Sequence, residues 1–267
     1  MINFYKAFLI VLGFFLIGCS SDESSTITTS EDTLYRLAAV SNEDVFGVVK
    51  IAKLNDTQSI IEVQLTGVSV GNHPVAIYAD NAVDGTSIAI SLNSLNASGY
   101  SSTTVSMLDS GVAIDYEELL EYDGHIKVKT STTDATLLAR GDIGVNTLTG
   151  ESTTYVLNSS TVPTISGLVI FAKRKNEETL VVIELEGTTT GSHPAAIYNN
   201  DLATTGAVTL SLNDVDGALG EGRTNVTQLN DATPMTYDEL IGYNGHLLVK
   251  LSATDASIVA EGNIGEN

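Results

Sequence analysis

The sequence predicts an all-β protein built from two tandem β-sandwiches. Two observations support this fold class: the chain repeats itself at a spacing of 120 residues, and apolar residues within each copy recur with a period of two. Composition agrees with a folded chain. Apolar residues make up 43% of the 267 residues and charged residues 17%, which is not typical of a disordered protein.

The first element is an apolar segment at the amino end. Lys6 is the one charged residue among residues 1–18, and the eleven residues Ala7–Ile17 form an apolar run. As a helix this run would rise about 16 Å, roughly half the thickness of a bilayer core, so it is too short for an ordinary membrane span. We therefore predict that residues 1–18 are a secretory signal peptide.

The next element is Cys19, the one cysteine of the chain. Leu16-Ile17-Gly18-Cys19 resembles the bacterial lipobox, in which the signal is cleaved before the Cys and its thiol is acylated. The resemblance implies lipidation at Cys19 and a membrane anchor in the cell envelope, at the outer membrane. The alternative is an ordinary cleaved signal followed by a buried structural Cys. Cleavage would remove Lys6 and take the formal side-chain charge from −21 to −22.

Residues 19–33 are predicted to be the acylated Cys and a flexible tether. From Ser20 to Asp32 the chain consists of Ser, Thr, Asp and Glu, with Ile27 as the one apolar residue. Such a segment cannot bury enough apolar surface to fold. Ser21-Asp22-Glu23 resembles the acidic export signals of surface lipoproteins in the Bacteroidetes, which implies exposure at the cell surface; a plain polar tether is the alternative.

The rest of the chain consists of two tandem copies of one domain. Residues 35–93 match residues 155–213 at an offset of 120, and a one-residue insertion in the second copy makes the later offset 121. This period is longer than that of solenoid repeats, so each copy should be a complete domain with its own core. We predict domains at 34–146 and 153–267, joined by a linker at 147–152. The matched pairs include Tyr35 with Tyr155, His73-Pro74 with His193-Pro194, Tyr116 with Tyr237, and Gly124-His125 with Gly245-His246.

Strands are predicted wherever apolar and polar residues alternate within a copy. Ile61, Val63 and Leu65 alternate with polar residues, and the matched segment of the second copy carries Val181, Ile183 and Leu185. One apolar and one polar face per strand is what two antiparallel sheets over a common core require. One helical turn interrupts the pattern in each copy. Thr236 and Glu239 have the spacing of a capping box, Asp115 and Glu118 repeat it, and we expect Gly245 and Gly124 to end these turns.

With these motifs in hand, each copy resembles a chordin-type (CHRD) domain. The segments that carry the resemblance are His73–Tyr78, Tyr116–Gly124, Ile126–Thr130 and Ala139–Gly144, together with their counterparts in the second copy. The resemblance covers residues 35–144 and 155–265. It implies an immunoglobulin-like β-sandwich, similar to the fold of copper/zinc superoxide dismutase, and a secreted or lipid-anchored protein; it implies little chemistry.

The four histidines occur at two positions of the repeat, and each position holds a His in both copies: His73 matches His193, and His125 matches His246. Imidazole is a common ligand of zinc and copper, so His73 and His193 are the candidate metal ligands. A structural role is the competing interpretation, since His73 precedes a Pro where its ring can hydrogen-bond the backbone. His125 shares a strand face with Lys127 and Lys129, so we expect it to point to solvent.

The dismutase comparison favours a protein that is not an enzyme. Where many CHRD domains and the dismutase carry a His-apolar-His pair, this chain has Ala76-Ile77-Tyr78 and Ala196-Ile197-Tyr198. We therefore expect no catalytic residues and no cofactor, with a metal-binding protein (Cu/Zn or Ca) as the alternative. Asn213–Gly217 suggests a calcium loop but does not have the EF-hand spacing. Tyr78 and Tyr198 are candidate ligand contacts, with packing as the competing role.

Net charge limits the partners. The chain has 33 Asp and Glu against 12 Lys and Arg, an excess that would repel phosphate backbones and argues against nucleic acid. We expect a membrane partner through the lipid and an extracellular protein or polysaccharide as the partner of the two domains. Two copies on one tether would raise avidity for a repetitive partner. The sequence thus predicts a lipid-anchored envelope protein with a binding, adhesive or structural role.

Overall fold

The computed structural model describes residues 31–40 and 44–267. The predicted signal peptide, Cys19 and most of the predicted tether lie outside the described residues. Residues 31–267 form one compact unit. None of the helices in the described part of the chain has the length and apolarity needed to cross a bilayer.

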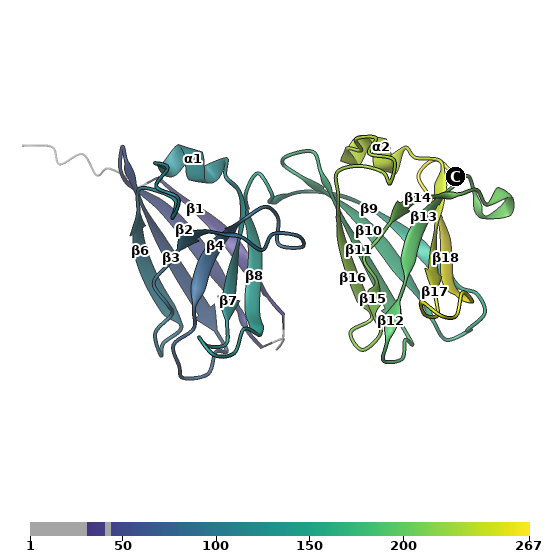
Figure 1. The fold of residues 1–267 in the computed structure, drawn as a ribbon, viewed down its shortest axis with the longest axis horizontal. Coiled ribbons are helices and arrows are strands. Elements are labelled where there is room, and N and C mark those ends of the chain that lie inside the picture. The colour runs from purple at the N-terminus through teal and green to yellow at the C-terminus, as the bar shows by residue number, and fades with distance from the viewer. Residues whose placement is uncertain (1–30, 41–43) are drawn as a thin grey trace, which may run out of the picture. The chain divides into compact units, whose positions relative to one another are not determined.

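The first copy is an all-β, sandwich-like domain (Figure 1). Its described strands form one curled antiparallel sheet of eight strands in the order β5-β4-β7-β8-β1-β2-β3-β6. Strand β1 joins the two halves of the sheet, because Asp32–Leu37 pair with β2 whereas Ala38 and Ala39 pair with β8. The elements are β1 (Asp32–Ala39), β2 (Phe46–Asn55), β3 (Gln58–Thr66), β4 (Val75–Ala79), β5 (Ile88–Ser91), β6 (Tyr100–Val105), α1 (Tyr116–Leu120), β7 (Asp123–Lys129) and β8 (Leu137–Gly144).

The second copy repeats this arrangement with two additional short strands, β12 and β15. Strand β9 occupies the position that β1 has in the first copy: it pairs with β10 along most of its length and with β18 near its end. The elements are β9 (Leu148–Ser159), β10 (Ser166–Arg174), β11 (Thr179–Glu186), β12 (Ser192–His193), β13 (Ala195–Asn199), η1 (Leu202–Thr204), β14 (Val208–Ser211), β15 (Val215–Asp216), β16 (Glu221–Val226), α2 (Tyr237–Ile241), β17 (Gly245–Lys250) and β18 (Ile258–Ile264).

The apolar residues of the predicted alternating strands form the core. Ile61, Val63 and Leu65 are at most 2% exposed, while Gln64 and Thr66 on the same strand face out. One cluster of buried residues runs from Tyr35 to Ile143 and a second from Leu157 to Ile264, so each copy has a core of its own. Burying a side chain of this size stabilises the fold by about 1.5 to 3 kcal/mol.

Both helical turns begin at the predicted capping boxes. The Asp115 carboxylate accepts the Glu118 N–H, Thr236 does the same for Glu239, and each Glu reaches back to its cap residue. The predicted ends at Gly124 and Gly245 are wrong, because α1 ends at Leu120 and α2 at Ile241, and both glycines lie in strands. Gly124 is instead a position with no room for a side chain, because a Cβ there would lie 2.6 Å from the Tyr122 ring.

The predicted linker at 147–152 is mostly strand. Strand β9 begins at Leu148, and Ser152 pairs with Ala172 of β10. The Thr and Gly content of this stretch suggested a loop, but Thr is β-branched and fits a strand. Gly150, with a φ of 91°, lies where the register of β9 against β10 shifts between Ala172 and Arg174.

A buried arginine connects the copies at this joint. Arg174, at the end of β10, is fully buried and donates to Asp142 Oδ2 at 2.7 Å, to Asn225 Oδ1 at 2.7 Å and to the Asn146 carbonyl. Asp142 and Asn146 belong to the first copy and Asn225 to the second. Val83 of the first copy also packs against the apolar cluster of Ala172, Leu180 and Val182. These contacts explain why the described residues 31–267 form one compact unit.

Candidate functional site

The predicted metal candidate His73 is buried, with both ring nitrogens facing backbone carbonyl oxygens. Its ring is 1% exposed, Nδ1 lies 2.8 Å from the Thr130 carbonyl oxygen, and Nε2 lies 2.9 Å from the Ser69 carbonyl oxygen. Each nitrogen thus faces an acceptor of its own, which leaves neither one free toward a metal ion. The expected hydrogen bonding of this ring to backbone is present.

His193 has the same place with weaker contacts. It is 2% exposed, its Nε2 lies 3.3 Å from the Thr189 carbonyl oxygen, and its Nδ1 is buried with no hydrogen-bond partner. Within residues 31–40 and 44–267 no group of three or more His, Cys, Asp or Glu residues is placed to hold a metal ion.

His125 and His246 are buried, so the expectation that His125 points to solvent is wrong. Both side chains are fully buried, and their Nδ1 atoms lie 2.6 Å and 2.7 Å from the carbonyl oxygens of Asp80 and Asn200. His125 does lie on the outer face of β7, but the loop that follows β4 covers it. A Cβ on Gly85 of that loop would lie 2.5 Å from the His125 ring. Burial lowers the pKa of His125, and nearby Lys127 lowers it further.

Tyr78, one of the predicted ligand contacts, packs against these rings. It is 5% exposed, stacks on His125 with ring centroids 5.3 Å apart, and lies under Lys127 with Nζ 4.9 Å from the ring centroid. Tyr198 makes the matching stack on His246 at 5.4 Å and is partly exposed. The structure therefore brings each tyrosine together with a histidine, in contacts that stabilise the fold.

The suggested calcium loop uses its carboxylates internally. Asp216 Oδ1 accepts the Ala218 N–H at 2.8 Å, and Asp214 accepts the Ser192 hydroxyl. The Asp216 hydrogen bond shapes the turn between β15 and β16, and the Asp214 hydrogen bond joins the segment before β15 to β12.

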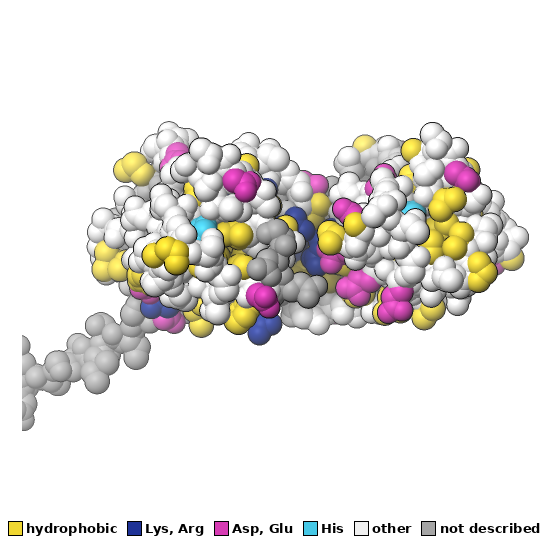
Figure 2. Space-filling view, turned by 90° about the horizontal axis from the view of Figure 1, so that it is seen from below, with side chains coloured by type: hydrophobic (Ala, Val, Ile, Leu, Met, Phe, Trp, Pro, Cys, Tyr) yellow, Lys and Arg dark blue, Asp and Glu magenta, His cyan; other side chains and the backbone are white. Residues whose placement is uncertain are grey.

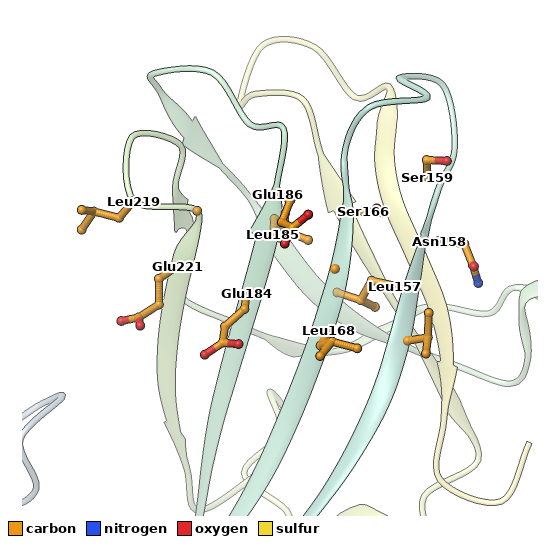
Figure 3. A pocket seen from close by; sticks show the side chains of 13 residues that line it. Leu157, Asn158, Ser159, Ser166, Leu168, Glu184, Leu185, Glu186, Leu219 and Glu221 are labelled. Atoms are coloured by element: carbon orange, nitrogen blue, oxygen red, sulfur yellow. The ribbon is translucent and has the colours of Figure 1, made fainter.

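The hollowed surfaces lie elsewhere, on the outer face of β9, β10 and β11 and at the matched face of β1, β2 and β3. A groove of about 650 Å³ in the second copy, called groove 2, has walls of Val156, Leu168, Glu184, Glu186, Leu219 and Glu221. Figure 3 shows Leu168, Glu184 and Glu221 on neighbouring strands, with Leu219 on the adjoining loop. A groove of about 630 Å³ in the first copy, called groove 1, is lined by Arg36, Ala38, Phe46, Val48, Gln64 and Thr66.

The two grooves occupy equivalent positions of the repeat. Val48 matches Leu168, Gln64 matches Glu184, and Thr66 matches Glu186, all at the offset of 120. Strand β2 approaches β3 closely at Gly47, and β10 approaches β11 closely at Gly167. A Cβ on either glycine would overlap a carbonyl oxygen of the adjacent strand. Exposed apolar side chains line both hollows, with Phe46 58% exposed and Val156 59% exposed.

The linings differ in charge. Groove 2 carries three glutamates, and Glu184 lies directly opposite Glu221 in the register of β11 and β16. Hydrogen bonds from Arg223 lower the pKa of Glu221 below its usual range, so it stays ionised at neutral pH. Among the described residues, groove 1 has no carboxylate in its wall and contains the Arg36 guanidinium. The two grooves therefore share a position in the repeat but differ in the charge of their walls.

Sequence reasoning did not find the grooves. Outward-facing Phe46, Val48, Val156 and Leu168 were the available signal, because apolar residues on the solvent face of a strand are unneeded for the core. Comparison with protein families, with curated proteins and with solved structures finds no match to this chain.

Proposed function

We propose that this protein is a lipid-anchored cell-envelope protein whose two CHRD-like domains bind a surface partner, a protein or a polysaccharide, without catalysing a reaction. The lipobox resemblance around Cys19 supports the anchor, and the acidic run behind it supports exposure at the outer membrane surface. The CHRD resemblance of both copies supports a binding role.

One structural observation carries the binding role: the same sheet face is hollowed in both copies and keeps exposed apolar side chains. Isolated exposed apolar residues need no explanation, but a groove that keeps exposed apolar side chains at matched positions of both copies is typical of an interaction site. The predicted metal candidate His73 does not offer a comparable ligand site. The ring nitrogens of His73 both face backbone carbonyl oxygens, which is a structural use.

The anchor is tested by labelling cells with a fatty-acid analogue. We expect the wild-type chain to carry the label and to sediment with the envelope. A Cys19→Ser variant should be unlabelled and lose its membrane association. A chain that is equally labelled and equally sedimented after this substitution would refute the lipid anchor at Cys19.

Binding is tested with the full chain in detergent against isolated cell surfaces. Val48→Asp and Leu168→Asp place a charge in groove 1 and groove 2, where the side chains are 41% and 38% exposed, so folding should survive. Val70→Asp is the control, since Val70 is 86% exposed and lines neither groove. We expect saturable binding that at least one groove variant reduces and the control does not. Equal binding by all three variants would contradict a role for the grooves.

A metal-binding protein is the alternative, and the buried Nε2 atoms of His125 and His246, which have no hydrogen-bond partner, are the observation in its favour. Elemental analysis of protein purified without tags or chelators separates the two functions. The binding protein predicts about zero metal ions per chain, whereas the alternative predicts at least one, since imidazole nitrogens would have to be ligands.

A further inference from the structure

A cleft of about 780 Å³ adjoins groove 1. Arg36 and Ala38 lie in the walls of both hollows, so groove 1 and the cleft form one continuous surface across β3, β2, β1 and β8. On the far side the cleft is lined by Leu180, Glu221 and Arg223 of the second copy. We refer to groove 1 and the cleft together as the basic channel.

Both carboxylates in the cleft wall are already engaged. Glu221 accepts two hydrogen bonds from the Arg223 guanidinium, at 2.6 Å and 3.2 Å. Asp142 accepts from Arg174 and from the Ala82 N–H, each at 2.7 Å. Glu221 and Asp142 also attract the Arg140 guanidinium electrostatically, but neither forms an ion pair with it.

Two guanidinium groups of the channel have no acidic partner in the described part of the chain. Arg140 donates one long hydrogen bond, 3.4 Å, to the Ala82 carbonyl oxygen, and the Arg36 guanidinium makes no hydrogen bond or ion pair with a described residue. Burial and the neighbouring Arg223 lower the pKa of Arg140 more than the charges of Glu221 and Asp142 raise it. Among the described residues, these two arginines therefore form no ion pair with an acid, although the sequence has 33 Asp and Glu.

The repeat provides an internal control for these cations. Lys127 of β7 pairs with Arg140 of β8, and Ala38 of β1 pairs with Arg140 on its other side, so the basic residues share one face. At the matched positions of the second copy, Arg36 becomes Val156, Lys127 becomes Leu248 and Arg140 becomes Glu261. The fold therefore does not require these cations, and they occur in the copy that forms the basic channel.

We propose that the basic channel binds an anionic polysaccharide, a polymer whose sugar rings carry carboxylate or sulfate groups. The proposal rests on the binding function above and names the ligand class of the first copy. Arg36 and Arg140 present forked donors that match such acid groups. Phe46 offers an exposed ring for the apolar face of a sugar, and Gln64 and Thr66 offer polar groups for its hydroxyls.

An extended polymer fits better than a small anion because the recognising groups are spread along the surface. Arg140, Arg36 and Phe46 lie on three successive strands, β8, β1 and β2. Figure 2 shows Lys and Arg side chains gathered in a hollow, with hydrophobic and acidic side chains beside them. Glu184 and Glu186 of groove 2 repel a polyanion, so binding should occur in the basic channel and not in groove 2.

The test uses the full chain in detergent with immobilised polygalacturonate, and with its fully methyl-esterified form as the uncharged control. Dextran sulfate and dextran form a second pair that separates carboxylate from sulfate recognition. We expect saturable binding to at least one charged polymer, little binding to its uncharged partner, and weaker binding as salt is raised.

Variants then locate the site. Arg36→Gln should weaken binding by about tenfold, the loss expected when one charge-assisted contact disappears. Phe46→Ser, which installs the residue found at matched Ser166, should also weaken it. Lys250→Gln removes the same charge from the second copy at a position that lines neither hollow, and should change affinity less than about twofold. Arg36 is exposed, so unfolding curves should confirm that its variant folds normally.

Equal affinity for a charged polymer and its uncharged partner would overturn the proposal, as would equal effects of Arg36→Gln and Lys250→Gln. Failure to bind any charged polymer would overturn it while leaving the binding function intact if cell-surface binding persists. Loss of both would remove the proposal and the binding function together.

Discussion

Replacing Arg174 by Met tests whether the buried ion pair holds the joint between the copies. The substitution removes a guanidinium that is fully buried and keeps an unbranched apolar chain in its place. Three acceptors lose their donor: Asp142 Oδ2, Asn225 Oδ1 and the Asn146 carbonyl.

The expected loss of unfolding free energy is about 3 kcal/mol. Breaking a buried ion pair by removing one partner costs about 3 to 5 kcal/mol, because a charge is left buried and unpaired. The Asp142 side chain is 16% exposed and keeps its hydrogen bond from the Ala82 N–H, which places the cost near the lower end. With a urea slope of about 2 kcal/mol per molar, the midpoint should fall by about 1.5 M.

The assay is urea unfolding followed by circular dichroism and by tyrosine fluorescence, since the chain has ten Tyr and no Trp. Leu54→Met is the control, because Leu54 matches Arg174 in the first copy and is 50% exposed; it should cost less than about 0.5 kcal/mol. In an Asp142→Asn background, Arg174→Met should cost less, since the unpaired charge is gone. A loss below about 1 kcal/mol for Arg174→Met alone would refute the reasoning.

Three further predictions concern the fold of each copy. Thr236→Ala removes the cap of α2 and should lower the unfolding free energy by about 1 kcal/mol in chemical denaturation, whereas Thr236→Ser should not. Gly167→Ala would force a Cβ onto the Glu184 carbonyl oxygen and should cost about 1 to 3 kcal/mol by the same measurement; a neutral result would contradict the close strand approach. Burial lowers the pKa of His125 from 6.5, so its contribution to stability is present above pH 6.5 and is lost as pH falls through the folded-state value. The fall in urea midpoint between pH 7 and pH 5 should therefore shrink in His125→Phe, and an unchanged fall would show that other groups cause it.

Groove 1 and groove 2 illustrate how a repeated fold diversifies. The glycines Gly47 and Gly167 keep the backbone geometry of the hollow, because neither position has room for a Cβ. The outward-facing side chains around them contribute nothing to the core and are free to change. Arg36 and Gln64 make groove 1 basic to neutral, while Glu184 and Glu221 make groove 2 acidic.

The sequence by itself determined the repeat, the strands and the capped turns. Periodicity and capping depend on residues a few positions apart, so alternation at Ile61, Val63 and Leu65 and the spacing of Thr236 and Glu239 were sufficient. Where a local signal was ambiguous, pairing decided: the predicted linker became β9 because its backbone hydrogen-bonds to β10.

Only the tertiary structure decided which surfaces are buried and which are hollow. His125 has the strand position of an exposed residue, yet the loop containing Gly85 covers it. Arg174 is buried because Asp142, 32 positions earlier, reaches it across the joint. The basic channel likewise needs β1 and β8, which are far apart in sequence and adjacent in the sheet. Burial and electrostatics depend on all the neighbours in space, and those neighbours come from segments whose pairing no local pattern specifies.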